Sequence, residues 1–165
     1  MNKTCFFDLF SLFQFQSASI NSKYDHVVNT TARCELDTRA DTVCVGKNFR
    51  ALEPTGQTCE VSGFHQSFDS LKNVPIAKAA MAYTLETGDT VILVINKVLY
   101  FGSQMDHSLI NPNQIRVYGI DVSDNPFDKD KDSGIDHVEC FIPFETAGST
   151  IFFESFVPSH EQLNN

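Results

Sequence analysis

One short segment of the sequence carries residue types that could do acid–base chemistry. Asp37 ends an apolar stretch, and the hydroxyl residue Thr38 follows it at once. A carboxylate at the end of a strand can point into a cleft, while a threonine hydroxyl bonds the neighbouring backbone and fixes the turn. Asp and Thr are also ordinary turn residues, so the segment taken alone favours a structural turn.

A second group of candidate ligands lies in the acidic run from residue 128 to 139. Its carboxylates fall at the calcium-binding places of a twelve-residue loop: Asp128, Asp130, Asp132, Asp136 and Glu139. Gly134 stands one place later than such a loop requires, and an EF-hand also needs a helix on each side. Asn125-Pro126 precedes the run and a β-patterned stretch follows it. We therefore interpret the run as a solvated acidic linker, with a calcium-binding module as an alternative function.

The histidines and cysteines form no recognisable ligand set. No two of the five histidines stand at the helical i, i+4 spacing of a zinc site, and the five cysteines include no C-x-x-C pair. An odd number of cysteines predicts reduced thiols in an intracellular, cytoplasmic protein. Cysteine catalysis by Cys44 or Cys59 with His65 is a further alternative without a local signature. We expect no metal and no cofactor.

Length and charge limit the classes of partner. The 165 residues are 42% hydrophobic, which is enough for a single packed domain. Twelve Lys and Arg against 21 Asp and Glu leave a formal charge of −9, which repels phosphates, so direct nucleic-acid binding is not expected. The longest apolar stretch, residues 5–15, is interrupted by polar residues and is too short to span a bilayer, so we expect no membrane partner.

The elements that must position Asp37 are mostly short strands. Strands are predicted at residues 33–37, 42–45 and 58–61, with turns at 38–41 and 54–56 and a loop at 63–73. The clearest element is a hairpin of residues 74–85 and 90–101, in which the apolar run 91–95 predicts burial on both faces. A short helix is predicted at 112–118, with Gly119 as its stop, and a second hairpin at 138–144 and 150–156. The chain is predicted to be mainly β: a poorly ordered, flexible leader (1–31), a main domain (32–122), and an acidic linker with a C-terminal hairpin (123–165).

Two blocks of this sequence resemble a known family. Asp37-Thr38-Arg39-Ala40-Asp41 is similar to an Asp-Ser/Thr-Gly-Ala motif. Val98-Leu99-Tyr100-Phe101-Gly102, followed by residues 106–115 and Gly119-Ile120, looks like a strand leading to a short helix and a terminal glycine. In this order and separation the blocks resemble the retropepsin-like aspartic proteases of long-terminal-repeat retrotransposons, in particular the protease region of copia-type Gag-Pol polyproteins. The resemblance covers roughly residues 33–122 and implies a closed β-sheet domain with one short helix.

The resemblance also implies an activity and a partner. Each chain would supply one catalytic aspartate, Asp37, so the active enzyme would be a homodimer that cleaves a polypeptide substrate. Two carboxylates about 3 Å apart cannot both ionise, so the pair keeps one proton. The ionised member would take a proton from the attacking water, and the protonated member would donate to the scissile carbonyl oxygen. Thr38 would lock the two loops across the two-fold axis, Ala40 and Asp41 would contact substrate, and residues 62–73 would form a flap.

The sequence departs from this pattern at Arg39, where the family has glycine. The backbone N–H survives the substitution, but the side chain adds a positive charge beside the carboxylates and places Arg39 among the substrate-contacting candidates. That charge favours an ionised carboxylate and opposes proton sharing. A catalytically decayed, protease-derived fragment that binds only peptides or partners is therefore a second hypothesis.

Overall fold

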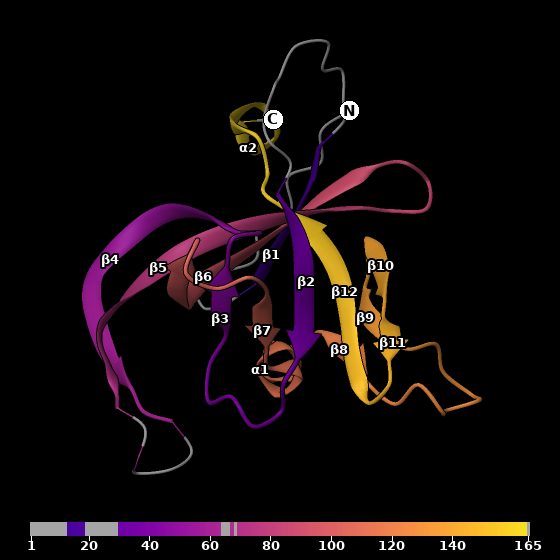
Figure 1. Cartoon of the computed structure of the whole chain (residues 1–165). Coiled ribbons are helices and arrows are strands. Elements are labelled where there is room, and N and C mark those ends of the chain that lie inside the picture. The colour runs from indigo at the N-terminus through magenta and orange to yellow at the C-terminus, as the bar shows by residue number, and fades with distance from the viewer. Residues whose placement is uncertain (1–12, 19–29, 64–66, 68, 165) are drawn as a thin grey trace.

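The computed structural model describes residues 13–18, 30–63, 67 and 69–164 of the chain (Figure 1). In these residues the strands are β1 (Phe13–Ala18), β2 (Thr31–Leu36), β3 (Cys44–Gly46), β4 (Arg50–Val61), β5 (Leu71–Thr84), β6 (Thr90–Gly102), β7 (Ser108–Ile110), β8 (Asp121–Ser123), β9 (Gly134–His137), β10 (Cys140–Pro143), β11 (Glu145–Ala147) and β12 (Thr150–Phe156). The helices are α1 (Pro112–Val117) and α2 (His160–Asn164). The predicted mainly β class is confirmed, with a second short helix at the C-terminal end that the sequence analysis missed.

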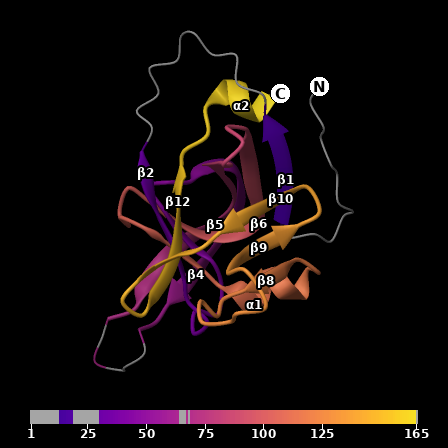
Figure 2. The ribbon, with the colours of Figure 1, turned by 90° about the vertical axis from the view of Figure 1, so that its right-hand side faces the viewer.

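Six strands of the large sheet are hydrogen-bonded in a ring. Their order is β6, β3, β7, β2, β12 and β5, and β5 pairs again with β6. Within this ring each strand has a neighbour on both sides, so the ring has no free edge. β1 pairs with β6 and β4 pairs with β5 outside the ring. A smaller sheet of β10, β9 and β8 lies beside the ring and faces the viewer in Figure 2.

The central hairpin forms where the sequence predicts it. β5 and β6 pair from Thr84 opposite Thr90 back to Ile76 opposite Leu99. Gly88 closes the turn with a φ of 87°, a conformation that glycine adopts without steric cost. Every residue from 91 to 95 is buried, as predicted.

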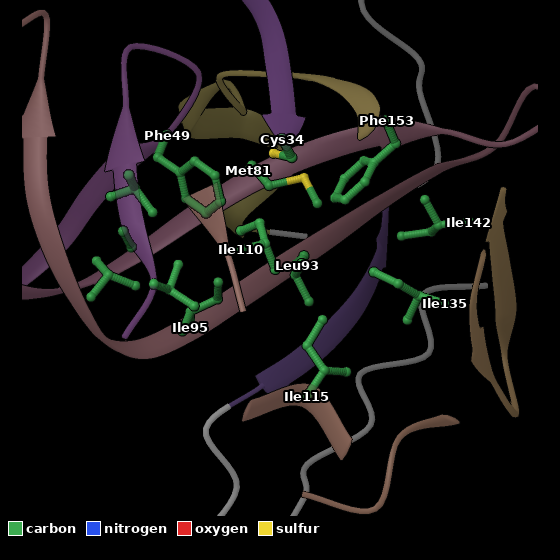
Figure 3. Packing of buried hydrophobic residues seen from close by; sticks show 14 of the residues in the cluster. Cys34, Phe49, Met81, Leu93, Ile95, Ile110, Ile115, Ile135, Ile142 and Phe153 are labelled. Carbon is green, nitrogen blue, oxygen red and sulfur yellow. The ribbon is translucent and has the colours of Figure 1, made fainter. Parts of the chain in front are cut away.

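Burial of both faces of this hairpin follows from two apolar clusters. The main core joins both sheets, and Figure 3 shows Ile135 and Ile142 of the small sheet directed toward the same interior as Leu93 of β6. Ile92 and Val94 belong to a second cluster, against which Leu163 of α2 packs. Fully burying an aliphatic side chain of this size stabilises the fold by about 1.5–3 kcal/mol. Residues 91–95 are therefore all apolar because they alternate between the main core and the second cluster.

Helix α1 has clear start and stop signals. Asn111 caps it by accepting hydrogen bonds from the backbone of Asn113 (2.8 Å) and Gln114 (3.4 Å). Pro112 occupies the first turn, and Gly119 follows the helix with a φ of 80°. The predicted helix is confirmed, ending one residue earlier than expected.

Several local predictions were wrong. Residues 13–18, assigned to the leader, form β1, while residues 1–12 and 19–29 lie outside the described part. The turn predicted at residues 54–56 is a register shift inside β4, where Gly56 has a φ of 74°. A bulge of this kind uses the same turn residues without ending the strand. β5 begins at Leu71, so the predicted loop is shorter than 63–73.

The predicted C-terminal hairpin pairs differently. Thr150–Phe156 forms a hairpin with Glu145–Ala147, whereas Cys140–Pro143 pairs with β9 in the small sheet. Ile142 is thereby buried in the main core. β12 also lies between β2 and β5 in the ring, so the segment 123–165 supplies one of the ring strands.

Candidate functional site

The loop that carries Asp37, residues 37–43 between β2 and β3, is called the Asp37 loop below. It begins where β2 runs parallel to β7, and the Asp37 backbone N–H extends that pairing by donating to the carbonyl of Ile110 (3.0 Å). The half-buried Asp37 carboxylate accepts a hydrogen bond from the backbone N–H of Arg39 (2.9 Å between N and Oδ1). The carboxylate is thus held by its own turn, at the end of a strand inside the ring.

Side chains of α1 hold the rest of the Asp37 loop. The side-chain amide of Asn111 donates to the carbonyl of Ala40. Gln114 accepts from the backbone N–H of Val43 (3.0 Å) and donates to the carbonyl of Asp41 and the hydroxyl of Thr42 (both 3.4 Å). The loop has no regular secondary structure, so these contacts supply the partners its backbone groups need.

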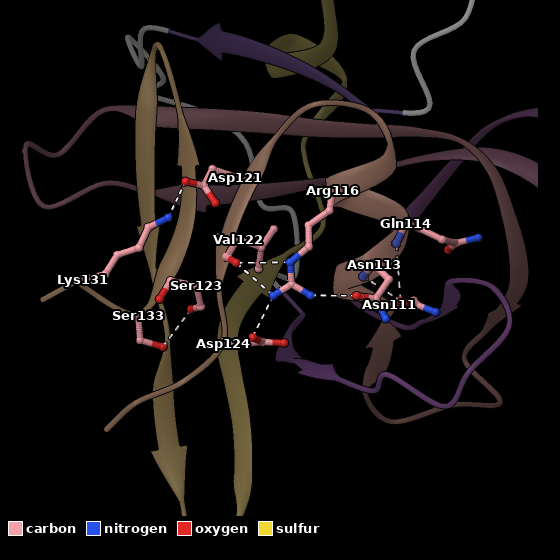
Figure 4. A network of polar contacts seen from close by, with 10 residues as sticks. All are labelled: Asn111, Asn113, Gln114, Arg116, Asp121, Val122, Ser123, Asp124, Lys131 and Ser133. Carbon is pink, nitrogen blue, oxygen red and sulfur yellow. Dashed lines mark hydrogen bonds and ion pairs between the residues drawn. The ribbon is translucent and has the colours of Figure 1, made fainter. Parts of the chain in front are cut away.

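At its other end α1 is fixed to the small sheet. Figure 4 shows the Arg116 guanidinium between Asn113, Val122 and Asp124. Its Nη2 donates to the carbonyl of Val122 (2.9 Å) and to the carboxylate of Asp124 (2.7 Å). Ile115 is buried in the main core. The helix that positions the Asp37 loop is therefore itself anchored on two sides.

A cleft of about 550 Å³ lies next to the Asp37 loop. The loop and β3, the far end of β4, and β5 and β6 form its walls; its lining residues are Arg39, Ala40, Asp41, Thr42, Cys44, Cys59, Glu60, Val61, Ser62, Ile76, Lys97, Val98 and Leu99. In Figure 1 the Asp37 loop and the far end of the β4–β5 hairpin lie at the same end of the molecule. The lining combines aliphatic side chains with two cationic and two anionic ones.

Arg39 fits the loop without the freedom of a glycine. Among the described residues, Asn73 is the only non-glycine with a positive φ, so the backbone of Arg39 is unstrained. Its N–H reaches Asp37, and its exposed side chain lines the cleft. Arg39 therefore leaves the turn of the Asp37 loop intact and adds a positive charge to the wall of the cleft.

Of the two cysteines that line the cleft, Cys44 is not set up as a nucleophile. Burial, reinforced by Cys59 and Asp37, raises the pKa of the Cys44 thiol to about 11. A catalytic cysteine needs the opposite shift, because the thiolate is the nucleophile. The histidine proposed as its partner, His65, lies outside the described residues. The raised pKa argues against Cys44 as a catalytic nucleophile, whereas the Cys59–His65 pair stays untested.

The acidic run does not gather into a calcium loop. Gly134–His137 is the strand β9, which places Asp136 in the small sheet, and Lys131 forms an ion pair with Asp121. The carboxylate of Asp128 accepts from the backbone N–H of Asp130 (2.9 Å). In the described part of the chain, no three His, Cys, Asp or Glu side chains are grouped to hold a metal.

The structure brings most of the predicted site residues together. Arg39, Ala40 and Asp41 line the cleft, whereas Asp37 and Thr38 lie beside it on the same loop. Of the predicted flap, Ser62 lines the cleft, residues 71–73 belong to β5, and residues 64–66 and 68 lie outside the described part. Sequence reasoning missed the roles of Asn111 and Gln114, whose helix it predicted but whose contacts span about seventy residues of sequence.

The described residues contain no helix with the length and apolar character that crossing a membrane requires. In comparisons with known proteins, no family model, no curated protein and no solved structure matched this chain significantly.

Proposed function

We propose that this protein is an aspartic endopeptidase of retropepsin type, active as a homodimer with one Asp37 from each copy. The observation that carries the proposal is the position of Asp37. Its carboxylate is fixed by the N–H of Arg39 on a loop that continues directly into the wall of a peptide-sized cleft. The long β4–β5 hairpin, whose far end also lines that cleft, supports the comparison with a flap.

The chemistry requires a second copy. One carboxylate cannot act as general base and general acid in the same step, whereas two that share a proton can. The ionised Asp37 takes a proton from water as the water oxygen bonds to the scissile carbonyl carbon. The protonated Asp37 of the other copy donates its proton to the carbonyl oxygen. The first Asp37 then gives the proton taken from water to the amide nitrogen, while the second removes a hydroxyl proton as the carbonyl re-forms, so that the C–N bond breaks and the amine leaves. Thr38 would contribute its hydroxyl at the axis between the two loops.

The proposal places the protein in the cytoplasm. The described cysteines Cys34, Cys44, Cys59 and Cys140 are free thiols. Free thiols are typical of a reducing compartment.

The proposed activity is tested with a peptide-library digest at acidic and neutral pH. Asp37→Asn keeps an oxygen that can accept from the Arg39 N–H, so its fold is expected to survive while cleavage falls by at least about a thousandfold. The matched control is Asp128→Asn, which changes an exposed carboxylate of the acidic run and is expected to keep full activity. Equal cleavage by wild type and Asp37→Asn would refute the proposal.

A second candidate, a peptide-binding module without catalysis, is favoured by one observation. The Arg39 side chain adds a positive charge to the wall of the cleft, on the same loop as the carboxylate that must share a proton. If no peptide is cleaved at any pH and library peptides still bind in the cleft, this second function replaces the first.

A further inference from the structure

We propose that Gln114 is a positioning residue: it does not line the cleft, but it holds in place the part of the Asp37 loop that forms one wall of the cleft. Gln114 does not line the cleft, yet its side-chain amide contacts three consecutive residues of the Asp37 loop. Two of these, Asp41 and Thr42, line the cleft themselves. The inference concerns the shape of the cleft, and its consequence for cleavage rests on the proposed function.

The contacts of Gln114 use both ends of its amide. The oxygen accepts from the Val43 N–H (3.0 Å), and the nitrogen donates to the Asp41 carbonyl and the Thr42 hydroxyl (3.4 Å each). A primary amide is the side chain that can accept and donate in this way at once, since a carboxylate only accepts and an ammonium only donates. The arrangement therefore specifies the side-chain chemistry at position 114 as well as its size.

The loop is attached to one rigid support at both ends. At the start of the loop, the backbone N–H of Asp37 donates to the carbonyl of Ile110. At its end, the backbone N–H of Val43 donates to the side-chain oxygen of Gln114. Ile110 is fully buried, and Ile115 anchors the helix in the core. Between the two attachments, Asn111 holds Ala40. Replacing Gln114 should therefore loosen residues 41–43 in the cleft wall, while Asp37 stays bonded to Ile110.

Hydrogen exchange separates this local role from a general loss of stability. In Gln114→Leu, the Val43 amide loses its acceptor, and its protection is expected to fall about tenfold, as for loss of one or two hydrogen bonds. The Asp37 amide, bonded to Ile110, serves as the internal reference and keeps its protection. Val117→Ala, on the same helix and 79% exposed, is the matched control variant and changes neither amide.

Gln114→Glu adds a test that a purely structural role would not pass. An ionised glutamate still accepts from Val43 but loses both donated hydrogen bonds, whereas a protonated one regains an O–H donor. Because the acceptor for Val43 is kept, Val43 protection in Gln114→Glu should fall less than in Gln114→Leu. The part lost with the donated hydrogen bonds should return as the pH falls through about 4.3, the ordinary pKa of glutamate. This variant also serves if Gln114→Leu does not fold.

Peptide cleavage provides a second test, because KM and kcat are expected to respond differently to a change at Gln114. Because Gln114 positions a binding wall and not the Asp37 carboxylate, KM for a cleaved peptide should rise about tenfold in Gln114→Leu while kcat changes less than about twofold. A fall in kcat at unchanged KM would overturn the inference, as would unchanged Val43 protection in both variants. If the wild-type chain cleaves nothing, the proposed function fails, and the exchange measurements still decide the role of Gln114.

Discussion

Cys44 provides a direct probe of the cleft. Burial, with smaller contributions from Cys59 and Asp37, raises the pKa of its thiol from an ordinary value of 9.0 to about 11. At pH 8 the thiolate share is then about 0.1%, compared with about 10% for a thiol of pKa 9.0, so alkylation is expected to be about 100-fold slower. The rate should rise about tenfold per pH unit up to about pH 11.

The assay is alkylation by iodoacetamide from pH 7 to pH 10, followed by mass spectrometry of the peptide that contains Cys44. Asp37→Asn removes one of the charges that raise this pKa, so its Cys44 should react faster at pH 8, while the remote Asp128→Asn leaves the rate unchanged. A Cys44 rate in wild type that levels off near pH 9 would refute the burial of this thiol. An Asp37→Asn rate equal to that of wild type would refute its closeness to Asp37.

Three further outcomes are expected. Arg39→Gly removes a positive charge from the loop that carries Asp37, so cleavage is expected to be kept or to increase. Lower turnover with intact dimers would show that Arg39 binds substrate. Phe153→Ala leaves a cavity where the Phe153 ring packs against Tyr83 and Phe144, so the free energy of unfolding in urea should fall by about 3–5 kcal/mol. A fall below about 1 kcal/mol would contradict this packing. Millimolar calcium should not change the melting temperature of wild type or of Asp128→Ala, since the described residues contain no grouped metal ligands. A calcium-dependent rise in the melting temperature of wild type that is lost in Asp128→Ala would restore the calcium hypothesis.

The elements that the sequence predicted correctly are those specified by neighbouring residues. The β5–β6 hairpin follows from a glycine turn between two largely apolar runs, and α1 follows from the Asn111 cap, Pro112 and Gly119. Position along the chain also brought residues 37–41 into one loop, so the candidate carboxylate and its cleft-lining neighbours could be named in advance.

The features that could not be predicted depend on distant pairing. The turn residues at 54–56 give the same signal for a turn and for a bulge, and only the pairing of β4 with β5 distinguishes them. Cys140–Pro143 pairs with β9 in the small sheet and thereby buries Ile142 in the main core, a pairing that no local pattern specifies. The contacts of Gln114 with the Asp37 loop likewise require the folded chain.

The central claim is that two Asp37 carboxylates, one from each copy, form a single active site. It is tested most directly by titrating wild-type protein with Asp37→Asn at constant total concentration, after co-purification of a tagged with an untagged copy has established that the two proteins form mixed dimers. If both carboxylates are needed, only wild-type homodimers cleave, and an equal mixture retains about one quarter of the activity. An activity of about one half, linear in the wild-type fraction, or cleavage by a wild-type monomer, would contradict the account.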